Sequence, residues 1–285
     1  MKTFSTSIFL IVILLSTSFG AKPAKPLSVI DLELHPGGTY MMTTKASVNG
    51  HEGRFIFDTG GGISYISPEF AKAAACEPWG QITGFMLTGQ RLDMQRCDGL
   101  AFDVDGLHLP LASLGVFDIG KFMPPKTPKI DGSIGLDAFA GKTVTLSLAG
   151  KKLTVESTSS LRERIRNGKE LPIRLVREAE GLALSVVAAV RTPKGVAWME
   201  LDSGNGGAHV VGKHIAQVIG LDTEKKEPQE GRLSFTDGIA IDGPFRVNPT
   251  LTMDGNIGTR FMINYNLTID LAGGRAWLAP AGGGN

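Results

Sequence analysis

Two stretches of the chain show the same order of apolar and polar positions. Residues 39–57 and 181–201 each consist of an alternating apolar strand, a turn that contains glycine, and a second apolar strand. The turns, Asn49-Gly50 and Pro193-Lys194-Gly195, have the composition of β-hairpin connections. The pattern therefore predicts one β-hairpin in each half of the chain.

Each predicted hairpin leads into an acidic triplet. The first triplet is Asp58-Thr59-Gly60 and the second is Asp202-Ser203-Gly204. The preceding runs are rich in aromatic and β-favouring side chains, so each Asp is expected at the end of a buried strand, on a turn. A single triplet of this kind is an ordinary turn. Two unrelated turns that happen to match remain the alternative explanation.

The similarity of the two halves continues downstream of the triplets. Both contain Asp-Gly-x-Ile-Gly, at 131–135 and 254–258, which is an offset of 123 residues. The apolar runs 144–148 and 267–271 keep this offset, as do Lys152 and Arg275. The triplets are 144 apart, so the first half holds 144 − 123 = 21 additional residues. We interpret the chain as a duplicated unit.

Composition agrees with a β-rich protein that does not bind nucleic acid. The chain has 285 residues, of which 42% are hydrophobic and 20% charged, and it contains 37 glycines. A net charge of +1 gives no reason to expect nucleic acid or an acidic membrane surface as partner. The basic residues near 162–166 alternate with acidic ones, which favours a solvated linker helix around 161–170.

Residues 1–20 have the features of a secretory signal peptide. Lys2 precedes an apolar run at 8–15, and small residues follow at 18–20. The apolar run is too short to span a bilayer comfortably, so no stable membrane anchor is expected, although a retained anchor is the alternative. We expect a periplasmic or secreted protein. In such a compartment Cys76 and Cys97, the only cysteines, are candidates for a disulfide, with two buried thiols as the alternative.

The two triplets and the elements Ser133-Ile134-Gly135 and Asn256-Ile257-Gly258 resemble those of the pepsin and retropepsin-like aspartic peptidases. More narrowly, the chain is similar to bacterial periplasmic members that carry both lobes in one polypeptide. The resemblance implies an all-β, two-lobed, pepsin-like acid protease fold built from a duplicated β-barrel unit. It implies an N-terminal lobe with a flap at 21–157, a linker at 158–171 and a C-terminal lobe at 172–285. Because one chain supplies both lobes, we expect a monomer.

The resemblance also implies an aspartic endopeptidase that hydrolyses peptide bonds in a peptide or protein substrate. Asp58 and Asp202 would be catalytic: they would share one proton and activate a water, without a cofactor or a metal. The supporting residues would be Thr59 and Ser203, whose hydroxyl groups would hold the two loops together, and Gly60 and Gly204, which would let backbone N–H groups approach the carboxylates.

Several positions depart from the family pattern. Gly61 and Asn205 follow the triplets where many relatives have a hydroxyl group, and Ser133 and Asn256 are more polar than usual. We therefore expect a less acidic pH optimum than that of pepsin. The alternative is an exported peptide-binding protein that has the same fold and has lost peptidase activity.

The segment 82–92 predicts a hairpin at the place of the family's flap, although the usual flap Tyr is absent. An ordinary surface hairpin is the alternative. His209 and His214 lie near the second triplet, but a spacing of five does not put them on one face of a helix, so no metal site is expected. Phosphate-loop and serine-hydrolase motifs do not fit the sequence.

Overall fold

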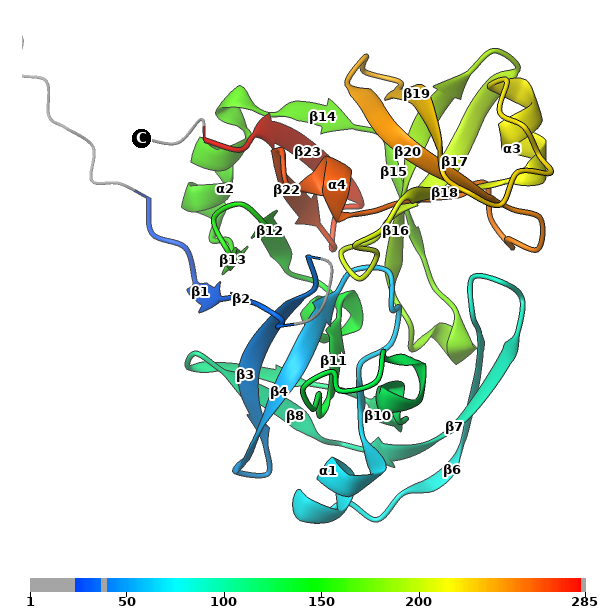
Figure 1. Cartoon of the computed structure of the whole chain (residues 1–285). Coiled ribbons are helices and arrows are strands. Elements are labelled where there is room, and N and C mark those ends of the chain that lie inside the picture. Colours follow the sequence, from blue (N-terminus) through cyan, green and yellow to red (C-terminus); the bar gives the residue numbers. More distant parts are fainter. Residues whose placement is uncertain (1–23, 37–39, 283–285) are drawn as a thin grey trace, which may run out of the picture.

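The computed structural model describes residues 24–36 and 40–282, which form two β-rich lobes and a third sheet that lies beside the second lobe and above the first in Figure 1. The expected signal peptide at 1–20 lies outside the described residues. Buried apolar side chains from both lobes and from the third sheet belong to one continuous core. Within the described part of the chain, none of the helices has the length and apolar content needed to cross a membrane.

The first lobe is built on a ten-stranded sheet with the order β6-β7-β10-β5-β11-β4-β3-β8-β9, in which β2 also pairs with β3. Its strands are β2 (Glu33–Leu34), β3 (Met42–Val48), β4 (His51–Asp58), β5 (Tyr65–Ile66), β6 (Trp79–Phe85), β7 (Arg91–Asp98), β8 (Ala101–Val104), β9 (Leu107–Pro110), β10 (Ser113–Val116) and β11 (Gly132–Gly135). Its helices are α1 (Pro68–Ala73) and the 3-10 turns η1 (Ile119–Phe122) and η2 (Leu136–Phe139).

The second lobe is built on a seven-stranded sheet with the order β15-β16-β17-β21-β18-β20-β19, and β16 also pairs with β19, which curls the sheet back on itself. Its strands are β15 (Ile173–Val176), β16 (Ser185–Thr192), β17 (Gly195–Leu201), β18 (His209–Gly212), β19 (Gln229–Phe235), β20 (Ala240–Asn248) and β21 (Gly255–Ile257). Its helices are η4 (Ala179–Gly181), α3 (Lys213–Val218) and α4 (Thr259–Met262).

A six-stranded sheet combines both halves of the chain, in the order β1-β13-β12-β22-β23-β14. Its strands are β1 (Ser28–Asp31), β12 (Thr143–Ser147), β13 (Lys152–Val155), β14 (Lys169–Leu171), β22 (Tyr265–Asp270) and β23 (Arg275–Pro280). At its centre Thr145 pairs with Thr268, which is 123 residues further on, and their hydroxyl oxygens lie 2.9 Å apart. The offset found in the sequence is therefore the relation between two strands that meet at the middle of this sheet.

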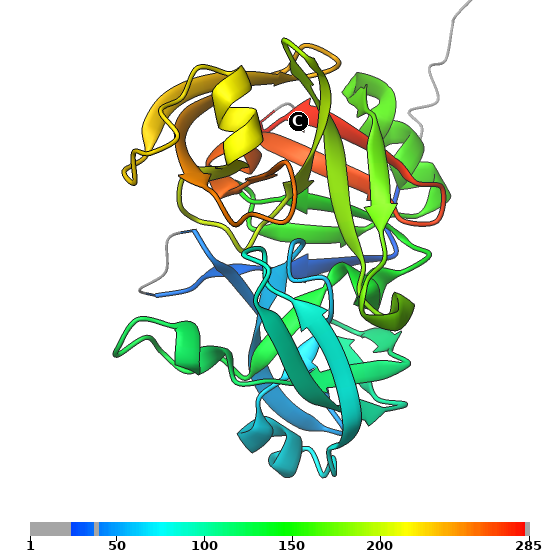
Figure 2. The ribbon, with the colours of Figure 1, turned by 90° about the vertical axis from the view of Figure 1, so that its right-hand side faces the viewer.

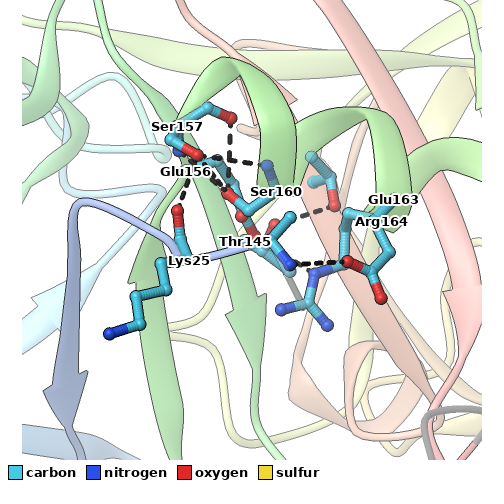
Figure 3. A network of polar contacts seen from close by, with 9 residues as sticks. Lys25, Thr145, Glu156, Ser157, Ser160, Glu163 and Arg164 are labelled. Atoms are coloured by element: carbon cyan, nitrogen blue, oxygen red, sulfur yellow. Dashed lines mark hydrogen bonds and ion pairs between the residues drawn. The ribbon is translucent and has the colours of Figure 1, made fainter. Parts of the chain in front are cut away.

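The connection between the lobes contains α2 (Thr158–Arg164) and the 3-10 turn η3 (Ile165–Asn167). Ser157 caps α2: its hydroxyl accepts the N–H of Ser160, while the hydroxyl of Ser160 accepts the N–H of Ser157. The Ser157 hydroxyl also donates to the Lys25 carbonyl at 2.7 Å, and Arg164 pairs with the buried Glu156 (Figure 3). These contacts hold the start of the described chain and the linker helix against the six-stranded sheet.

The hairpin predicted at 82–92 is present as β6 and β7, which pair from Phe85 and Arg91 down to Trp79 and Arg96. Figure 2 shows it rising from the first lobe toward the second. The predicted disulfide joins Cys76, just after α1, to Cys97 in β7, with 6.2 Å between the Cα atoms. It therefore fixes the base of this hairpin, which we call the flap.

The position of the β8–β9 hairpin accounts for much of the extra length of the first half. Along the chain this hairpin is inserted between β7 and β10, which pair directly with each other in the sheet. In the second half, β19 continues through the turn at 236–239 into β20 without such an insertion. The strand pairs themselves match: β10 runs parallel to β5, and β20 runs parallel to β18.

Candidate active site

The two triplets lie at corresponding strand ends that face each other between the lobes. β4 ends at Asp58 beside the parallel strand β11, and β17 ends one residue before Asp202 beside the parallel strand β21. The N–H of Asp202 donates to the Ile257 carbonyl at 3.0 Å, which extends this pairing into the triplet. Each Asp thus emerges from a strand that is buried between two neighbours, and its loop is held in place by the sheet.

A reciprocal set of hydrogen bonds joins the two loops. The Thr59 hydroxyl donates to the Leu201 carbonyl at 2.6 Å and accepts the N–H of Ser203 at 2.9 Å. In the mirror arrangement, the Ser203 hydroxyl donates to the Phe57 carbonyl at 3.0 Å and accepts the N–H of Thr59 at 3.0 Å. Both hydroxyl-bearing residues are almost fully buried. All four bonds are therefore shielded from water, and together they fix the distance and orientation of the loops.

Backbone amides in each loop point at that loop's own carboxylate. Asp58 Oδ1 accepts the N–H groups of Gly60 at 2.9 Å and Gly61 at 3.0 Å. Asp202 Oδ1 accepts the N–H groups of the two corresponding residues, at 2.7 and 3.1 Å. These bonds hold each carboxyl group in one orientation, and neither Oδ2 atom accepts a bond from these amides.

The triplet glycines allow each loop to approach the carboxyl group of the other. A Cβ atom on Gly60 would lie 2.5 Å from Cγ of Asp202, and one on Gly204 would lie 2.6 Å from Oδ2 of Asp58. Any side chain at these positions would push the loops apart. The glycines are therefore needed to bring Asp58 and Asp202 together.

Burial and proximity raise the pKa of Asp58 to about 7. The largest cause is loss of solvation, followed by the negative charge of Asp202, and a hydrogen bond between the two carboxyl groups acts in the same direction. The N–H groups of Gly60 and Gly61 oppose the shift. The pair consequently retains one proton up to near-neutral pH.

A third carboxyl group, on Glu200, stands beside the second Asp. Asn256 Nδ2 donates to Asp202 Oδ2 at 2.7 Å and to Glu200 Oε2 at 3.0 Å. Asn205 Nδ2 in turn donates to Asn256 Oδ1 at 2.8 Å, which fixes the orientation of the Asn256 amide. Burial, and then the charges of Asp202 and Asp58, raise the pKa of Glu200 well above its ordinary value.

Sequence reasoning did not single out Glu200. The available signal was its position in β17: it is the one charged residue in the run 195–201, and it is two residues before Asp202, so that both side chains point to the same face of the strand. The departures Asn205 and Asn256, noted from the sequence, belong to the same hydrogen-bond network.

The first lobe has a less polar arrangement at the equivalent place. Ile56 corresponds to Glu200 and Ser133 to Asn256, because Ser133 pairs with Ile56 in the sheet as Asn256 pairs with Glu200. The Ser133 hydroxyl donates to the Ile56 carbonyl at 3.4 Å. Tyr65 is buried nearby, and its pKa is raised by burial and by the charge of Asp58.

A cavity of about 560 Å³ adjoins the first acidic loop and Glu200. The flap lines one side, the strands β16 and β17 line another, and residues 252–254 complete it. The tip of the flap reaches the second lobe, where the Leu87 carbonyl accepts the N–H of Thr252 at 2.9 Å and its hydroxyl at 3.2 Å. The flap therefore spans the cavity from lobe to lobe.

The two histidines near the second triplet each contact another protein group. His209 is buried in β18, accepts the N–H of Gly258 at 3.3 Å, and has a pKa lowered to about 4, chiefly by burial. His214 Nε2 contacts Asp254 Oδ1 at 2.8 Å. Across residues 24–36 and 40–282 there is no cluster of three or more His, Cys, Asp or Glu side chains suited to hold a metal ion.

Comparisons with known proteins agree with this architecture. Residues 44–138, which include the first triplet and its β11 partner, match the family described as aspartyl protease. No curated protein sequence matches the chain. Basic 7S globulin from soybean is similar in structure, with a TM-score of 0.59, 10% identity, and coverage of 90% of this chain and 97% of the globulin.

A second solved structure, conglutin gamma, a basic 7S globulin from lupine seeds, aligns with a TM-score of 0.57 and 9% identity over 90% of this chain and 95% of its own. At such low identity these two structures support the fold alone. The aspartyl protease match over residues 44–138, the two-lobed all-β fold and the paired triplets together support a place in the pepsin-like aspartic peptidase superfamily.

Proposed function

We propose that the protein is an aspartic endopeptidase in which Asp58 and Asp202 are the catalytic residues. The observation that carries the proposal is the mirrored arrangement of the two triplets: each hydroxyl group bonds across to the opposite loop, and each glycine admits the opposite carboxyl group. Such reciprocity serves the alignment of two carboxyl groups and has no evident use in two independent turns.

The hydrogen bonds suggest how the two carboxyl groups divide the work. Asp202 accepts three donors, from two backbone amides and Asn256, whereas Asp58 accepts two backbone amides. The negative charge of the pair is therefore better supported at Asp202, and the shared proton resides at Asp58. The raised pKa of Asp58 agrees with this division.

In the proposed reaction, a water between the carboxyl groups attacks the peptide carbonyl carbon. Asp202 takes a proton from this water, while Asp58 donates its proton to the carbonyl oxygen, which gives a neutral tetrahedral diol. Collapse of the diol breaks the C–N bond: the departing nitrogen receives the proton held by Asp202, and a diol hydroxyl returns one to Asp58. The flap would exclude bulk water and bind the peptide backbone in extended form.

We also infer an exported, monomeric protein. The disulfide between Cys76 and Cys97 fits an oxidising compartment such as the periplasm or the extracellular space. A monomer suffices because one chain supplies both triplets. Peptides or proteins in that compartment would be the substrates.

Cleavage of a mixed peptide library between pH 3 and pH 8, with and without pepstatin, tests the proposal. The purified wild type should cleave, and Asp58→Asn and Asp202→Asn should each lower kcat/KM by at least about a thousandfold, because neither variant can share a proton between two carboxyl groups. Glu227→Gln, an exposed acidic residue outside the cavity, is the matched control. Full activity in either Asp variant would refute the proposed chemistry.

A second candidate function is an exported protein that binds peptides without cleaving them. Two findings favour it: the two similar solved structures are described as basic 7S globulins, and Gly61 and Asn205 replace the hydroxyl group that follows the triplet in many relatives. Peptide binding by the wild type without cleavage at any pH would support this candidate in place of the endopeptidase.

A further inference from the structure

Glu200 is placed where it can contact a substrate side chain. It lies in β17, is only 3% exposed, and lines the 560 Å³ cavity next to the first acidic loop. Glu200 in β17 and Asp202, which follows this strand, are held by the same Asn256 amide. A group bound against Glu200 would therefore lie next to the reacting atoms of the proposed mechanism.

Among the described residues, the carboxyl group of Glu200 has no cationic partner. None of the ion pairs formed within residues 24–36 and 40–282 includes it. Its charged neighbours are Asp58 and Asp202, which both repel it. A buried carboxyl group without a cation is costly to ionise, so it gains most from a cation delivered by a ligand.

The composition of the cavity fits a long side chain with a positive end. Three carboxyl groups line it, those of Glu178, Glu200 and Asp254, and none of the described residues lining it is Lys, Arg or His. Asp254 is already paired with His214, which leaves Glu200 as the deeply buried acid. Apolar walls come from the flap and from the second lobe: Ile82, Leu92, Met94, Ala183 and Val187.

Trp198 completes the wall next to Glu200, and the guanidinium of Arg174 stacks on its ring at 3.8 Å. Arg174 is exposed and does not line the cavity, so its charge faces solvent and leaves Glu200 unpaired. Apolar walls with an acid at one end match the alkyl stem and terminal charge of lysine or arginine.

From this geometry we propose that the cavity is a subsite for a lysine or arginine side chain of the substrate, and that Glu200 is the residue that selects it. The proposal rests on the proposed endopeptidase function, since it names the substrate class of the same site. The first lobe offers no such acid, because Ile56 stands at the position equivalent to Glu200. A basic residue is therefore expected at one defined position beside the cleaved bond.

The test begins with cleavage-site mapping in a peptide library, which defines that position. Two peptides are then compared that differ only there, with lysine in one and norleucine, which has the stem without the charge, in the other. Wild type should cleave the lysine peptide with a kcat/KM at least about tenfold higher, mainly through a lower KM. In Glu200→Gln this ratio should fall to near one, while in Glu227→Gln it should stay at the wild-type value.

The outcomes separate this inference from the proposed function. If wild type cleaves both peptides equally, or if Glu200→Gln keeps the preference for lysine, the inference is wrong and the endopeptidase stands. If wild type cleaves nothing in the library, the proposed function fails. Fluorescence anisotropy with a peptide that the protein binds, compared with the same peptide carrying norleucine in place of each lysine, then decides the inference: equal binding overturns it, and a lysine preference that is lost in Glu200→Gln supports it.

Folding of the variant is checked by circular dichroism. Should Glu200→Gln fail to fold, Glu200→Ile, which copies the first lobe, takes its place. The wild-type protein alone also tests the idea with an acetyl-lysine peptide, which removes the charge from the ligand and leaves the protein unchanged. Retention of tight binding or efficient cleavage with acetyl-lysine would contradict a role for the charge.

Discussion

The two acidic loops have the same backbone arrangement and different surroundings. In both, a hydroxyl group bonds across to the opposite loop and two amides bond the local carboxylate. Around Asp58 the neighbours at the sheet are Ile56 and Ser133, whereas around Asp202 they are Glu200 and Asn256. The hydrogen bonds that the two loops share hold the two carboxyl groups in place. The side chains that differ between the lobes give each carboxyl group a different environment.

The asymmetry is concentrated on one side of the cleft. Asn256 connects two carboxyl groups in the second lobe, and Asn205 orients it. In the first lobe the hydroxyl of Ser133 bonds only weakly, to a backbone carbonyl at 3.4 Å. The two loops thus share one backbone arrangement, and the polar side chains around the second loop distinguish it from the first.

The symmetric part of this comparison predicts the largest effect. Thr59→Val and Ser203→Ala each leave a buried carbonyl and a buried N–H without their partner, which should lower the free energy of unfolding by roughly 2–4 kcal/mol. Urea denaturation measures this. The two variants should agree to within about 1 kcal/mol. Thr154→Val, which removes a buried hydroxyl in β13 away from the triplets, is the control and should have a smaller effect. A large loss in only one of the two would break the symmetry.

The disulfide is a second difference between the lobes, because both of its cysteines lie in the first lobe and it should stabilise that lobe alone. Replacing Cys76 and Cys97 by Ser together should cost about 3 kcal/mol, because the closed loop has a sequence separation of 21 residues. Thermal unfolding with and without a reductant measures this. The wild type should lose stability on reduction, and the double variant should not respond. Equal melting temperatures of the oxidised wild type and the double variant would show that the disulfide does not stabilise the folded protein.

The symmetric features were largely predictable from the sequence. The triplets, the strands that lead into them and the 123-residue offset are local patterns, and Thr145 and Thr268 meet at that offset in the six-stranded sheet. The pairing of Cys76 with Cys97 followed from their being the only two cysteines. Such features depend on strand periodicity and turn chemistry, which a sequence displays directly.

The asymmetric features were harder to predict because they arise from contacts between distant segments. Glu200 acquires its environment from Asn256, 56 residues away, and from the flap, which arrives from the other lobe. The six-stranded sheet also depends on contacts between distant segments, because β12 pairs with β22 from the other half of the chain. A charged residue within an apolar run, on the same face as a candidate catalytic Asp, was the one local indication.

The raised pKa of Asp58 predicts a smaller effect, on the pH dependence of stability. The pKa is about 7 in the folded protein and near 3.8 ordinarily, so folding favours the protonated form. The resulting stabilisation is complete below about pH 4 and is lost as the pH rises through about 7. Asp58→Asn should remove this slope and should be more stable than wild type at pH 7 by about 2 kcal/mol, through relief of buried charge.

Melting temperatures between pH 4 and pH 8 check this prediction, and Glu227→Gln serves as the control because Glu227 is exposed. Proteolytic activity of the wild type should decline over the same rise through about pH 7, as the shared proton is lost. An unchanged slope in Asp58→Asn would mean that the group responsible is another buried acid, with Asp137, whose pKa burial raises to about 6, as the first to examine.

The smallest expected effect concerns Asn256, whose bond to Asp202 has no counterpart at Asp58. Asn256→Ser copies the first lobe and removes one of the three donors to Asp202, which weakens support for its negative charge. The acid limb of the kcat/KM profile should therefore move to higher pH by about one unit. Ser133→Ala, the counterpart change in the first lobe, removes a hydroxyl that bonds a carbonyl and should leave this limb in place. If both variants shift it equally, the asymmetry between the lobes does not control the acidity of the pair. If neither variant shifts it, the backbone amides alone support the charge on Asp202.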